Sequence, residues 1–313
     1  MTITQLQYVL AVAEHKNFTV AADKCFVTQP TLSMQIQKVE DELNIKLFDR
    51  TKKPILITTI GEKIVEQAKN IVNEAARIHD IIDQEKGFIG GDFKLGIIPT
   101  VTPTLLPMFL NSLVKKYPKL NLIIEELNTD EIILKLKNGQ LDAAIAVTPL
   151  EDEKLKEIVL YFEPFVAYMP NRPIDFNKKE LEISDLNFDE ILLLEDGHCF
   201  RNSILNLCKN QNAKNAQHFQ LKSGSFETLM KLADEGLGIT LLPYLHAQNL
   251  SEKDHQKIVN FQDPKPAREV SLIFPKIALK IHIIDAIRNT ISGVVKGAIA
   301  FQNVQIVSPI YKK

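Results

Sequence analysis

Residues 18–50 read FTVAADKCFVTQPTLSMQIQKVEDELNIKLFDR, and this stretch decides the fold of the amino-terminal part of the chain. Thr19 suits the cap of a short helix predicted at residues 20–25, and Thr28 with Pro30 suits the cap and first turn of a second helix. Two short helices joined by a tight turn predict a helix-turn-helix, whose second helix can enter a DNA major groove. A helical hairpin that serves only the core of its domain is the alternative.

The outward face of this second helix carries polar side chains that suit contacts to base edges and phosphates. The candidate DNA-contacting residues there are Thr28, Gln29, Pro30, Thr31, Ser33, Gln35 and Lys38. Strand-like runs at 46–50 and 55–58 predict a wing with a basic patch of Lys46, Arg50, Lys52 and Lys53 against Asp49, of which the last three basic residues are candidate DNA contacts. The whole chain has a formal net charge of −2. DNA binding would therefore depend on this small basic patch, doubled by dimerisation.

A longer helix is predicted at residues 62–86, because apolar residues recur there with alternating spacings of four and three. They are Ile64, Ala68, Ile71, Ala75, Ile78 and Ile82. This seam matches a two-helix coiled coil and predicts a dimer, whereas a single amphipathic helix packed on its own domain is the alternative. Gly87, Gly90 and Gly91 end the helix and mark a domain boundary.

Beyond residue 92 the pattern changes to strand-like runs that alternate with helical stretches. The predicted strands lie at 93–98, 122–126, 143–147, 165–169, 191–194, 239–242 and 270–274, and the predicted helices at 103–116, 130–138, 200–210, 225–236 and 279–298. This alternation is typical of parallel sheets wrapped by helices. The region is roughly 210 residues long, which favours two α/β lobes with a cleft between them.

Ligands in such folds bind where loops leave the carboxyl ends of the strands. Three loops meet this description, namely Pro99–Thr100, Asn128–Thr129 and Gly197–Cys199. Together they would bring two hydroxyls, an imidazole and a thiol into one pocket. Helix capping is the alternative role of both threonines.

Cys199 and Cys208 flank a predicted helix and differ in their surroundings. Cys199 follows Gly197 and His198 and precedes Arg201, an electropositive and partly open neighbourhood that lowers a thiol pKa. Cys208 lies in an apolar helical pattern. Nine helical residues rise about 13.5 Å, whereas a disulfide needs Cα atoms roughly 4.4 to 6.8 Å apart. A bond between the two would therefore have to unwind the helix; the alternative is that both are ordinary cysteines of the fold.

The composition indicates a globular protein without a secretion signal or a membrane-spanning segment. Of the 313 residues, 45% are hydrophobic, and the mean hydropathy is −0.04. Three cysteines are too few for a disulfide framework, so a reducing, cytoplasmic compartment is expected. Cys25 is expected to pack in the core of the first short helix. No cysteine or histidine spacing indicates a metal site, and no cofactor is expected.

Much of the stretch 18–50 resembles the amino-terminal signature of LysR-type transcriptional regulators. The resemblance covers residues 18–22, 27–36, 40–43 and 47–50, and the α/β region behind a helical linker agrees with it. It implies a winged helix-turn-helix, a long dimerising helix and a two-lobed α/β regulatory domain that resembles periplasmic binding proteins. The domains are accordingly predicted at 1–60 for DNA binding, 61–88 for the linker helix and 90–302 for redox sensing, with a tail of uncertain order at 303–313.

Within that family, residues 96–100, 192–199 and 238–243, together with the spacing to Cys208, resemble the members that sense hydrogen peroxide. This resemblance implies that Cys199 is the peroxidatic thiol and Cys208 the resolving thiol. It also implies a peroxide pocket and a guanidinium that stabilises the thiolate; the residues carried over are Pro99, Thr100, Thr129, Gly197, His198 and Arg268. Asn202 also belongs to this pocket, but it stands where the family has an acidic residue, and it cannot accept a proton as a carboxylate does.

The function implied is a peroxide-responsive regulator of antioxidant genes in the bacterial cytoplasm, and not an enzyme, since peroxide is consumed stoichiometrically. The partners implied are double-stranded promoter DNA, hydrogen peroxide, further copies of the chain in a dimer or tetramer, RNA polymerase and cytosolic thiol reductants, with no membrane. The alternatives are a LysR-type regulator that binds a metabolite between the lobes and a thiol peroxidase with a helical appendage. A substrate-binding protein is a further alternative, which the added helix-turn-helix disfavours.

Overall fold

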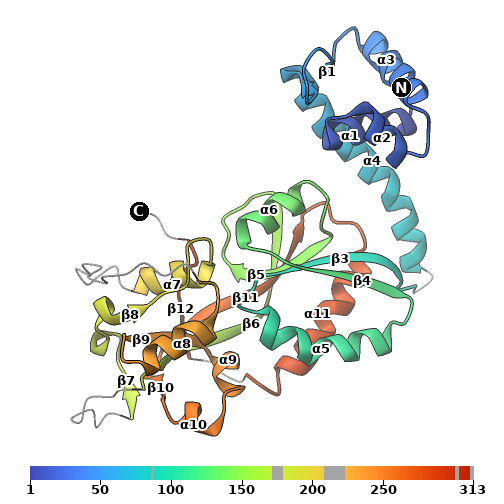
Figure 1. Ribbon diagram of the computed structural model, residues 1–313. Helices are drawn as coiled ribbons and strands as arrows, with labels where there is room; N and C mark the ends of the chain where they lie inside the picture. Colours follow the sequence, from blue (N-terminus) through green and yellow to red (C-terminus); the bar gives the residue numbers. More distant parts are fainter. Residues whose placement is uncertain (86–87, 171–178, 208–222, 300–302, 311–313) are drawn as a thin grey trace. The chain divides into compact units, whose positions relative to one another are not determined.

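The computed structural model describes residues 1–85, 88–170, 179–207, 223–299 and 303–310. The chain divides into two compact units, Met1–Phe88 and Ile89–Lys313 (Figure 1). Each unit buries hydrophobic residues of its own, and the second unit contains two such clusters. Separate cores are the property of segments that fold as domains or lobes.

Three helices form the core of the first unit: α1 (Ile3–His15), α2 (Phe18–Lys24) and α3 (Gln29–Leu43). Their apolar faces meet in one cluster of buried side chains, which includes Val9, Val12, Phe18, Ala21, Ala22, Leu32, Ile36, Val39, Leu47 and Phe48. The small side chains of Ala21 and Ala22 let α2 approach its neighbours closely. The helix-turn-helix prediction is confirmed by this arrangement of α2 and α3.

The caps of α2 and α3 determine where the turn lies. Asn17 accepts a hydrogen bond from the backbone of Thr19 and caps α2, so this helix begins at Phe18. The prediction of Thr19 as the cap is therefore wrong, because the Asn17 side chain accepts from the amides of Thr19 and Val20 and places Thr19 inside the helix. Thr28 caps α3 and Pro30 lies in its first turn, as predicted.

A short antiparallel hairpin follows α3 at the predicted position of the wing. β1 (Phe48–Asp49) pairs with β2 (Leu56–Ile57), and Phe48 faces Ile57 in the register. Both strands are shorter than the runs predicted from the sequence. The buried ring of Phe48 contacts Phe18 edge-on with ring centroids 6.0 Å apart, which attaches the hairpin to α2.

The long helix α4 (Thr59–Glu85) completes the first unit. It packs against α1 and buries Ala68. Farther along the same predicted seam, Ile71, Ile78 and Ile82 are exposed, and Ile78 retains 61% of its accessible surface. This part of the seam is not covered by the segments of the chain that the structure describes.

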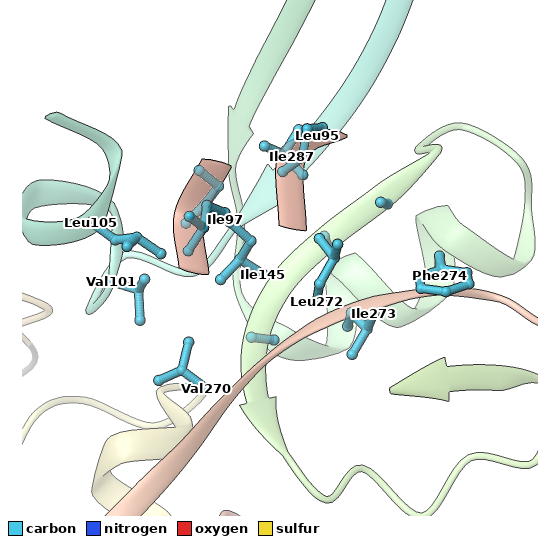
Figure 2. Close-up of a cluster of buried hydrophobic side chains, with 14 of the residues drawn as sticks. Leu95, Ile97, Val101, Leu105, Ile145, Val270, Leu272, Ile273, Phe274 and Ile287 are labelled. Atoms are coloured by element: carbon cyan, nitrogen blue, oxygen red, sulfur yellow. The ribbon is translucent and has the colours of Figure 1, made fainter. Parts of the chain in front are cut away.

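The first lobe of the second unit is a sheet between helices. β3 (Gly91–Ile97) pairs in parallel with β4 (Leu120–Glu126) and β5 (Ala143–Thr148). Every residue of β5 is buried, as expected for a strand with both faces covered. Helices α5 (Thr102–Lys116) and α11 (Ile281–Val295) lie on one side of this sheet and α6 (Thr129–Lys137) on the other (Figure 1). Figure 2 shows the core that results, with Leu95, Ile145 and Ile287 among its labelled side chains.

Two long strands run through both lobes. β6 (Leu155–Tyr168) and β11 (Lys265–Pro275) are antiparallel to each other, and β11 is also antiparallel to β5. The prediction of parallel sheets is therefore wrong at these strands, although both lobes also contain parallel pairs. The runs predicted at 165–169 and 270–274 are only parts of β6 and β11. A strand that crosses into the other lobe and a strand that returns must run in opposite directions.

The second lobe is built on the end of β6. β9 (Ile239–Pro243) and β10 (Ile258–Phe261) flank it, β8 (Ile191–Leu192) pairs with β9, and β7 (Glu180–Leu181) pairs with β10. Its helices are α7 (Cys199–Leu207), α8 (Phe226–Asp234), α9 (Tyr244–Gln248) and α10 (Glu252–His255). The Phe200 ring contacts Phe165 and Phe226 edge-on, with centroids 5.1 Å apart in each pair. These contacts hold α7 and α8 against β6.

The carboxyl-terminal segment belongs to the fold. β12 (Val304–Ile306) pairs in parallel with β11, and Val307 is buried. Asn206 on α7 donates to the carbonyl oxygens of Ser308 and Ile310 at 2.7 and 2.9 Å. The expectation of an uncertain tail is therefore wrong for residues 303–310, whereas 311–313 lie outside the described residues. Among the described helices, none combines the length and the apolar character needed to cross a membrane.

Candidate functional site

The Cys199 thiol lies at the junction of the two lobes. Cys199 is the first residue of α7 and is only 6% exposed. Its side chain belongs to the core of the first lobe, whereas Phe200 and Ile204 of the same helix pack in the core of the second lobe. A chemical change at the start of α7 therefore acts on the packing of both lobes.

The electrostatic environment of this thiol has two opposing parts. Burial raises the pKa of the Cys199 thiol and is the larger effect, while the Arg268 charge and the Thr129 hydroxyl lower it. The prediction of a partly open neighbourhood with a lowered thiol pKa is therefore wrong. The free energy lost when a thiolate is removed from water is larger here than the stabilisation that the nearby cation provides.

Arg268 supplies the positive charge, and it is completely buried on β11. Its Nη1 donates to the Thr100 hydroxyl at 2.9 Å, and its Nη2 donates to the Thr100 carbonyl oxygen at 3.0 Å. Its Nε donates to Oε2 of Glu163 at 2.9 Å. The guanidinium also lies over the Phe200 ring, 5.5 Å from its centroid. Arg268 thus connects the loop after β3, strand β6 and helix α7.

The two threonines of the predicted pocket do not cap helices. Val101 occupies the cap position of α5 and makes no side-chain cap bond, and Asn128 caps α6. The Thr129 hydroxyl is buried without a hydrogen bond of regular geometry among the described residues, and it lowers the pKa of the Cys199 thiol. The capping alternative is therefore wrong for both residues. Thr100, Cys199 and Arg268, which are buried, and the half-buried Thr129, whose hydroxyl is buried, instead form one cluster, which we call the thiol cluster.

The other predicted pocket residues adjoin the thiol cluster along the chain. Pro99 and Asn202 are half-buried. Gly197 is exposed and has a φ of +98°, a conformation that favours glycine. The half-buried His198 has its Nε2 3.9 Å from a carboxylate oxygen of Glu195. The imidazole also lies against Gly224, so its described neighbours are an acid on the preceding loop and this glycine.

Arg201 does not serve the thiol in the way the sequence suggested. Its Nε lies 2.9 Å from a carboxylate oxygen of Asp196, and its Nη1 donates to the Leu194 carbonyl oxygen at 3.1 Å. These contacts hold the loop that precedes α7. Cys208 lies outside the described residues.

Glu163 is a residue of this site that the sequence reasoning missed. Its buried carboxylate accepts from Arg268 and, through Oε1, from the Leu245 backbone amide at 2.9 Å. A signal was present, because Glu163 stands between aromatic residues in the run Phe162-Glu163-Pro164-Phe165. An acid inside an apolar run requires a cation or several donors once it is buried.

Two further titratable groups surround this ion pair. Burial raises the pKa of Tyr161 well above its usual range, and burial lowers the pKa of His246 from 6.5. Both side chains are therefore uncharged at neutral pH. Arg268 and Glu163 remain as the charged groups in contact here.

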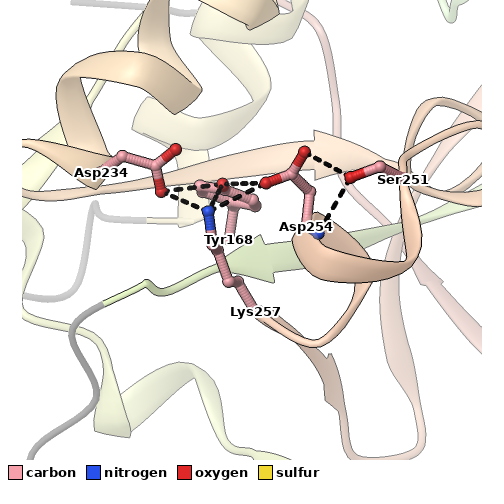
Figure 3. A network of polar contacts seen from close by, with 5 residues as sticks. All are labelled: Tyr168, Asp234, Ser251, Asp254 and Lys257. Atoms are coloured by element: carbon pink, nitrogen blue, oxygen red, sulfur yellow. Dashed lines mark hydrogen bonds and ion pairs between the residues drawn. The ribbon is translucent and has the colours of Figure 1, made fainter.

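A separate polar cluster joins α8, α10 and the end of β6 (Figure 3). The Lys257 ammonium donates to Asp234 at 2.7 Å, and to Asp254 and the Tyr168 hydroxyl at 2.9 Å. The bond to Asp234 is the main reason that the pKa of Lys257 lies above its usual value, and burial raises the pKa of Tyr168 to about 12. Three of these side chains, Tyr168, Asp234 and Asp254, line a pocket of about 390 Å³. Each charge in the cluster has an opposite charge beside it, which indicates a structural role.

The recognition helix α3 exposes part of its predicted DNA-contacting face. Thr28, Gln29, Pro30, Thr31 and Lys38 are exposed. The hydroxyls of Thr28 and Thr31 lie 2.8 Å apart. Ser33 and Gln35 are half-buried, and Gln35 accepts a bond of 3.0 Å from Gln5 of α1. The exposed residues are those in the first turn and Lys38, where a groove-bound helix contacts DNA.

Arg50 of the wing is held by the protein itself. Its Nη1 donates to the Ser33 hydroxyl and its Nη2 to Oε2 of the buried Glu40, both at 3.0 Å. Glu40 also accepts from the backbone amides of Leu47 and Phe48 at the start of β1, so it is an anchor of the wing that sequence reasoning missed. Lys52 and Lys53 are exposed. These two lysines are wing cations available to a phosphate, and Lys46 is also exposed, with its ammonium 3.6 Å from Oε2 of Glu40.

Two family descriptions match the chain. Residues 3–62 match "Bacterial regulatory helix-turn-helix protein, lysR family", and residues 86–291 match "LysR substrate binding domain". The first match covers α1 to the start of α4, and the second covers most of the two lobes. Together they span the recognition helix and the thiol cluster.

Several characterised proteins are similar over most of their length. A hydrogen peroxide-inducible genes activator from Pectobacterium carotovorum subsp. carotovorum is 37% identical over 275 residues, which are 88% of this chain and 90% of that protein. The DNA-binding transcriptional dual regulator OxyR of Escherichia coli is 35% identical over 274 residues, 88% of this chain and 89% of its own. A full-length OxyR variant from Pseudomonas aeruginosa has a TM-score of 0.75 at 31% identity, covering 93% of this chain and 98% of that one. A hydrogen-peroxide-bound OxyR variant from Corynebacterium glutamicum has a TM-score of 0.61 at 28% identity, covering 95% and 93%.

Proposed function

Because the chain belongs to the LysR family of bacterial regulatory helix-turn-helix proteins, we propose that it regulates oxidative-stress genes by sensing hydrogen peroxide with Cys199. The observation that carries this proposal is the burial of the Cys199 thiol at the start of α7 beside Arg268 and Thr129. A buried thiol in a cluster with one cation and two threonine hydroxyls suits a small neutral oxidant. The similarity to hydrogen peroxide-inducible genes activators supports the same function.

The first chemical step is oxidation of Cys199 to a sulfenic acid. The thiolate sulfur attacks one oxygen of hydrogen peroxide, the S–O bond forms as the O–O bond breaks, and the departing hydroxide takes up a proton to leave as water. Arg268 stabilises the thiolate before the attack, and the Thr129 hydroxyl hydrogen-bonds to it. The remaining pocket residues are Pro99, Thr100, Gly197, His198 and Asn202, whose amide holds a water or the departing oxygen.

The second step converts the oxidation into a mechanical change. The Cys208 thiol attacks the sulfenic sulfur, a disulfide forms and water leaves. The two Cα atoms must approach to roughly 4.4 to 6.8 Å, whereas nine helical residues span about 13.5 Å. α7 must therefore unwind, which withdraws Phe200 from Phe165 and Phe226. Cytosolic thiol reductants return the disulfide to the two thiols.

The change reaches promoter DNA through the oligomer. The exposed Ile71, Ile78 and Ile82 of α4 pair with the same helix of a second copy, and two such dimers form a tetramer. Repacking at α7 alters contacts between the copies and so the spacing of the two α3 helices, which bind half-sites about one helical turn apart. The DNA is bound by the exposed residues of α3 and by the wing lysines. RNA polymerase is the partner whose activity at the promoter responds to the changed spacing of the two α3 helices.

Mass spectrometry after graded hydrogen peroxide tests this switch, with free thiols alkylated before digestion. We expect a Cys199–Cys208 disulfide at micromolar peroxide. Cys25 lies in the first unit, away from this switch, so its thiol should remain free and become alkylated. A Cys25→Ser variant is the matched control and should form the same disulfide. If Cys199 and Cys208 both remain alkylated at high peroxide, the switch is refuted and a metabolite between the lobes becomes the leading effector.

The double variant Lys52→Ala/Lys53→Ala tests the DNA interface. We expect weaker binding to all DNA sequences and a salt dependence that is less steep by about 0.9 in log–log slope for each phosphate that is no longer neutralised. Fluorescence anisotropy with labelled promoter DNA at several salt concentrations measures this slope. Lys115→Ala/Lys116→Ala on α5 removes the same charge from the second unit and is the control. Equal slopes for the two double variants would exclude the wing lysines from the interface.

A further inference from the structure

The Arg268 guanidinium pairs with the Glu163 carboxylate, and its charge also acts on the buried Cys199 thiol, whose pKa it lowers. The side chains of Arg268 and Glu163 are each 0% exposed, and Nη2 lies 2.7 Å from Oε2. Nε donates to the same oxygen at 2.9 Å. The two residues face each other directly across the antiparallel ladder of β6 and β11. Their pairing is therefore held by the backbone as well as by charge.

The other bonds of this pair keep both side chains in place. Oε1 of Glu163 accepts from the backbone amide of Leu245 in α9, which has no side-chain cap of its own. The guanidinium nitrogens Nη1 and Nη2 donate to the hydroxyl and carbonyl oxygens of Thr100. Because each end is anchored, Arg268 cannot leave Glu163 to approach a thiolate more closely without breaking several buried bonds.

Other ionisable groups near the thiol cluster supply no second positive charge that could stabilise a Cys199 thiolate. His246 on α9 and Tyr161 on β6 are uncharged at neutral pH, because burial lowers the pKa of the first and raises that of the second. On the α7 side, the charges of Arg201 and Asp196 lie within 2.9 Å of each other. His198 faces the carboxylate of Glu195.

With Cys199 as a thiol, the buried pair is electrically neutral. Ionisation of Cys199 places a second negative charge beside one cation in a buried site, and such a charge is costly. The carboxylate has the stronger position, because it makes two bonds to the guanidinium and one to a backbone amide. The Glu163 carboxylate therefore neutralises much of the Arg268 charge, and only the remainder stabilises a Cys199 thiolate.

We propose that Glu163 competes with the Cys199 thiolate for the Arg268 guanidinium and thereby holds the resting protein in its less reactive thiol form. Glu163 acts through Arg268 and is a positioning residue in this scheme. The inference rests on the proposed function for its consequence, which is that Glu163 sets the peroxide concentration at which the switch closes. The net reaction is unchanged: one thiol and one peroxide give a sulfenic acid and water.

The substitution Glu163→Gln separates charge from shape. Glutamine has nearly the same shape and carries no negative charge. Its one amide oxygen can replace Oε2 toward Arg268 or Oε1 toward Leu245, so one of these two acceptor positions is lost. The thiolate becomes the remaining counter-ion of Arg268, so we expect the pKa of the Cys199 thiol to fall by about one unit. At neutral pH this corresponds to about tenfold more thiolate and to peroxide oxidation that is faster by a similar factor.

The measurement uses the full chain with Cys25→Ser and Cys208→Ser, so that Cys199 is the remaining thiol. The ultraviolet absorbance of the thiolate is followed against pH, and the absence of tryptophan from the chain keeps the background low. Glu157→Gln is the matched control, because Glu157 is on the same strand and its carboxylate also accepts a backbone amide bond, from Leu150 at 3.0 Å. We expect a lower midpoint for Glu163→Gln and an unchanged one for the control.

A midpoint for Glu163→Gln that equals or exceeds that of the parent would overturn the inference. If circular dichroism shows that this variant is unfolded, Glu163→Asp decides instead, because it draws the carboxylate back from Arg268 by one methylene. A smaller fall in its midpoint supports the competition, and an unchanged or higher midpoint contradicts it.

Sulfenic acid trapping on the same proteins separates this inference from the proposed function. A lowered midpoint without sulfenic acid in any variant leaves the competition standing and refutes peroxide sensing. Sulfenic acid in the parent together with an unchanged midpoint in Glu163→Gln supports peroxide sensing by Cys199 and refutes the competition.

Discussion

Cys199→Ser is expected to abolish the response to hydrogen peroxide and to leave DNA binding intact. A serine hydroxyl is not ionised near neutral pH and cannot be oxidised to a sulfenic acid, so the first step of the switch is lost. The change replaces one small buried atom at the start of α7, and we expect a stability cost of about 1 kcal/mol. α3 belongs to the other compact unit, so its contacts to DNA do not depend on this atom.

Footprinting on promoter DNA, with and without peroxide, measures both parts of this prediction. The wild-type footprint should change with peroxide, and the Cys199→Ser footprint should be present and unchanged. Cys25→Ser is the control for removal of a cysteine and should respond like the wild type. A normal peroxide-dependent change in Cys199→Ser would show that another group senses the oxidant.

Arg268→Met is expected to have the largest effect on stability and to slow the oxidation of Cys199. Methionine has a similar length without the charge, so Glu163 is left buried without its cation. Breaking a buried ion pair from one side costs about 3 to 5 kcal/mol. Arg268 lowers the pKa of the Cys199 thiol, so its loss raises that pKa further and reduces the thiolate fraction at neutral pH.

Chemical denaturation and peroxide stopped-flow measure the two effects. The double variant Arg268→Met/Glu163→Gln removes both charges and should recover part of the lost stability, but it should not recover the rate. Arg288→Met removes an arginine on α11 whose side chain is 39% exposed and pairs with Asp285 at 3.5 Å, and it should change stability by less than about 1 kcal/mol. Equal destabilisation by the two arginine substitutions would contradict the role given to the buried pair.

The helix-turn-helix could be predicted from the sequence because its signals are local. Thr28 and Pro30 mark the start of α3, and the spacing of Leu32, Ile36 and Val39 selects the face that is buried. The start of α2 was missed by two residues, since Asn17 and Thr19 are both competent caps and only the packed helix selects one. The exposed seam of α4 is likewise visible in the sequence as a repeat.

The sheet topology of the lobes was harder to predict from the sequence. β6 contains Glu163 and Pro164 in the middle of its apolar residues, so local periodicity divides it and only its second half was recognised. Its antiparallel pairing with β11 joins residues about a hundred positions apart, such as Glu163 and Arg268. Such pairings depend on which distant segments of the chain pack side by side, and a local sequence pattern does not contain that information.

By itself the sequence determined most of the longer elements, the recognition helix and the residue types of the thiol cluster, because helix caps, periodicity and motif spacing act over a few residues. Only the tertiary structure decided the state of the thiol. Neighbouring residues suggested a lowered pKa, but burial at the junction of the lobes raises it, and Arg201 is occupied by Asp196. Glu163 reaches the site through a strand pairing that no motif announces. The pKa of a buried group depends on the water and charges around it in three dimensions, and these are set when distant segments pack together.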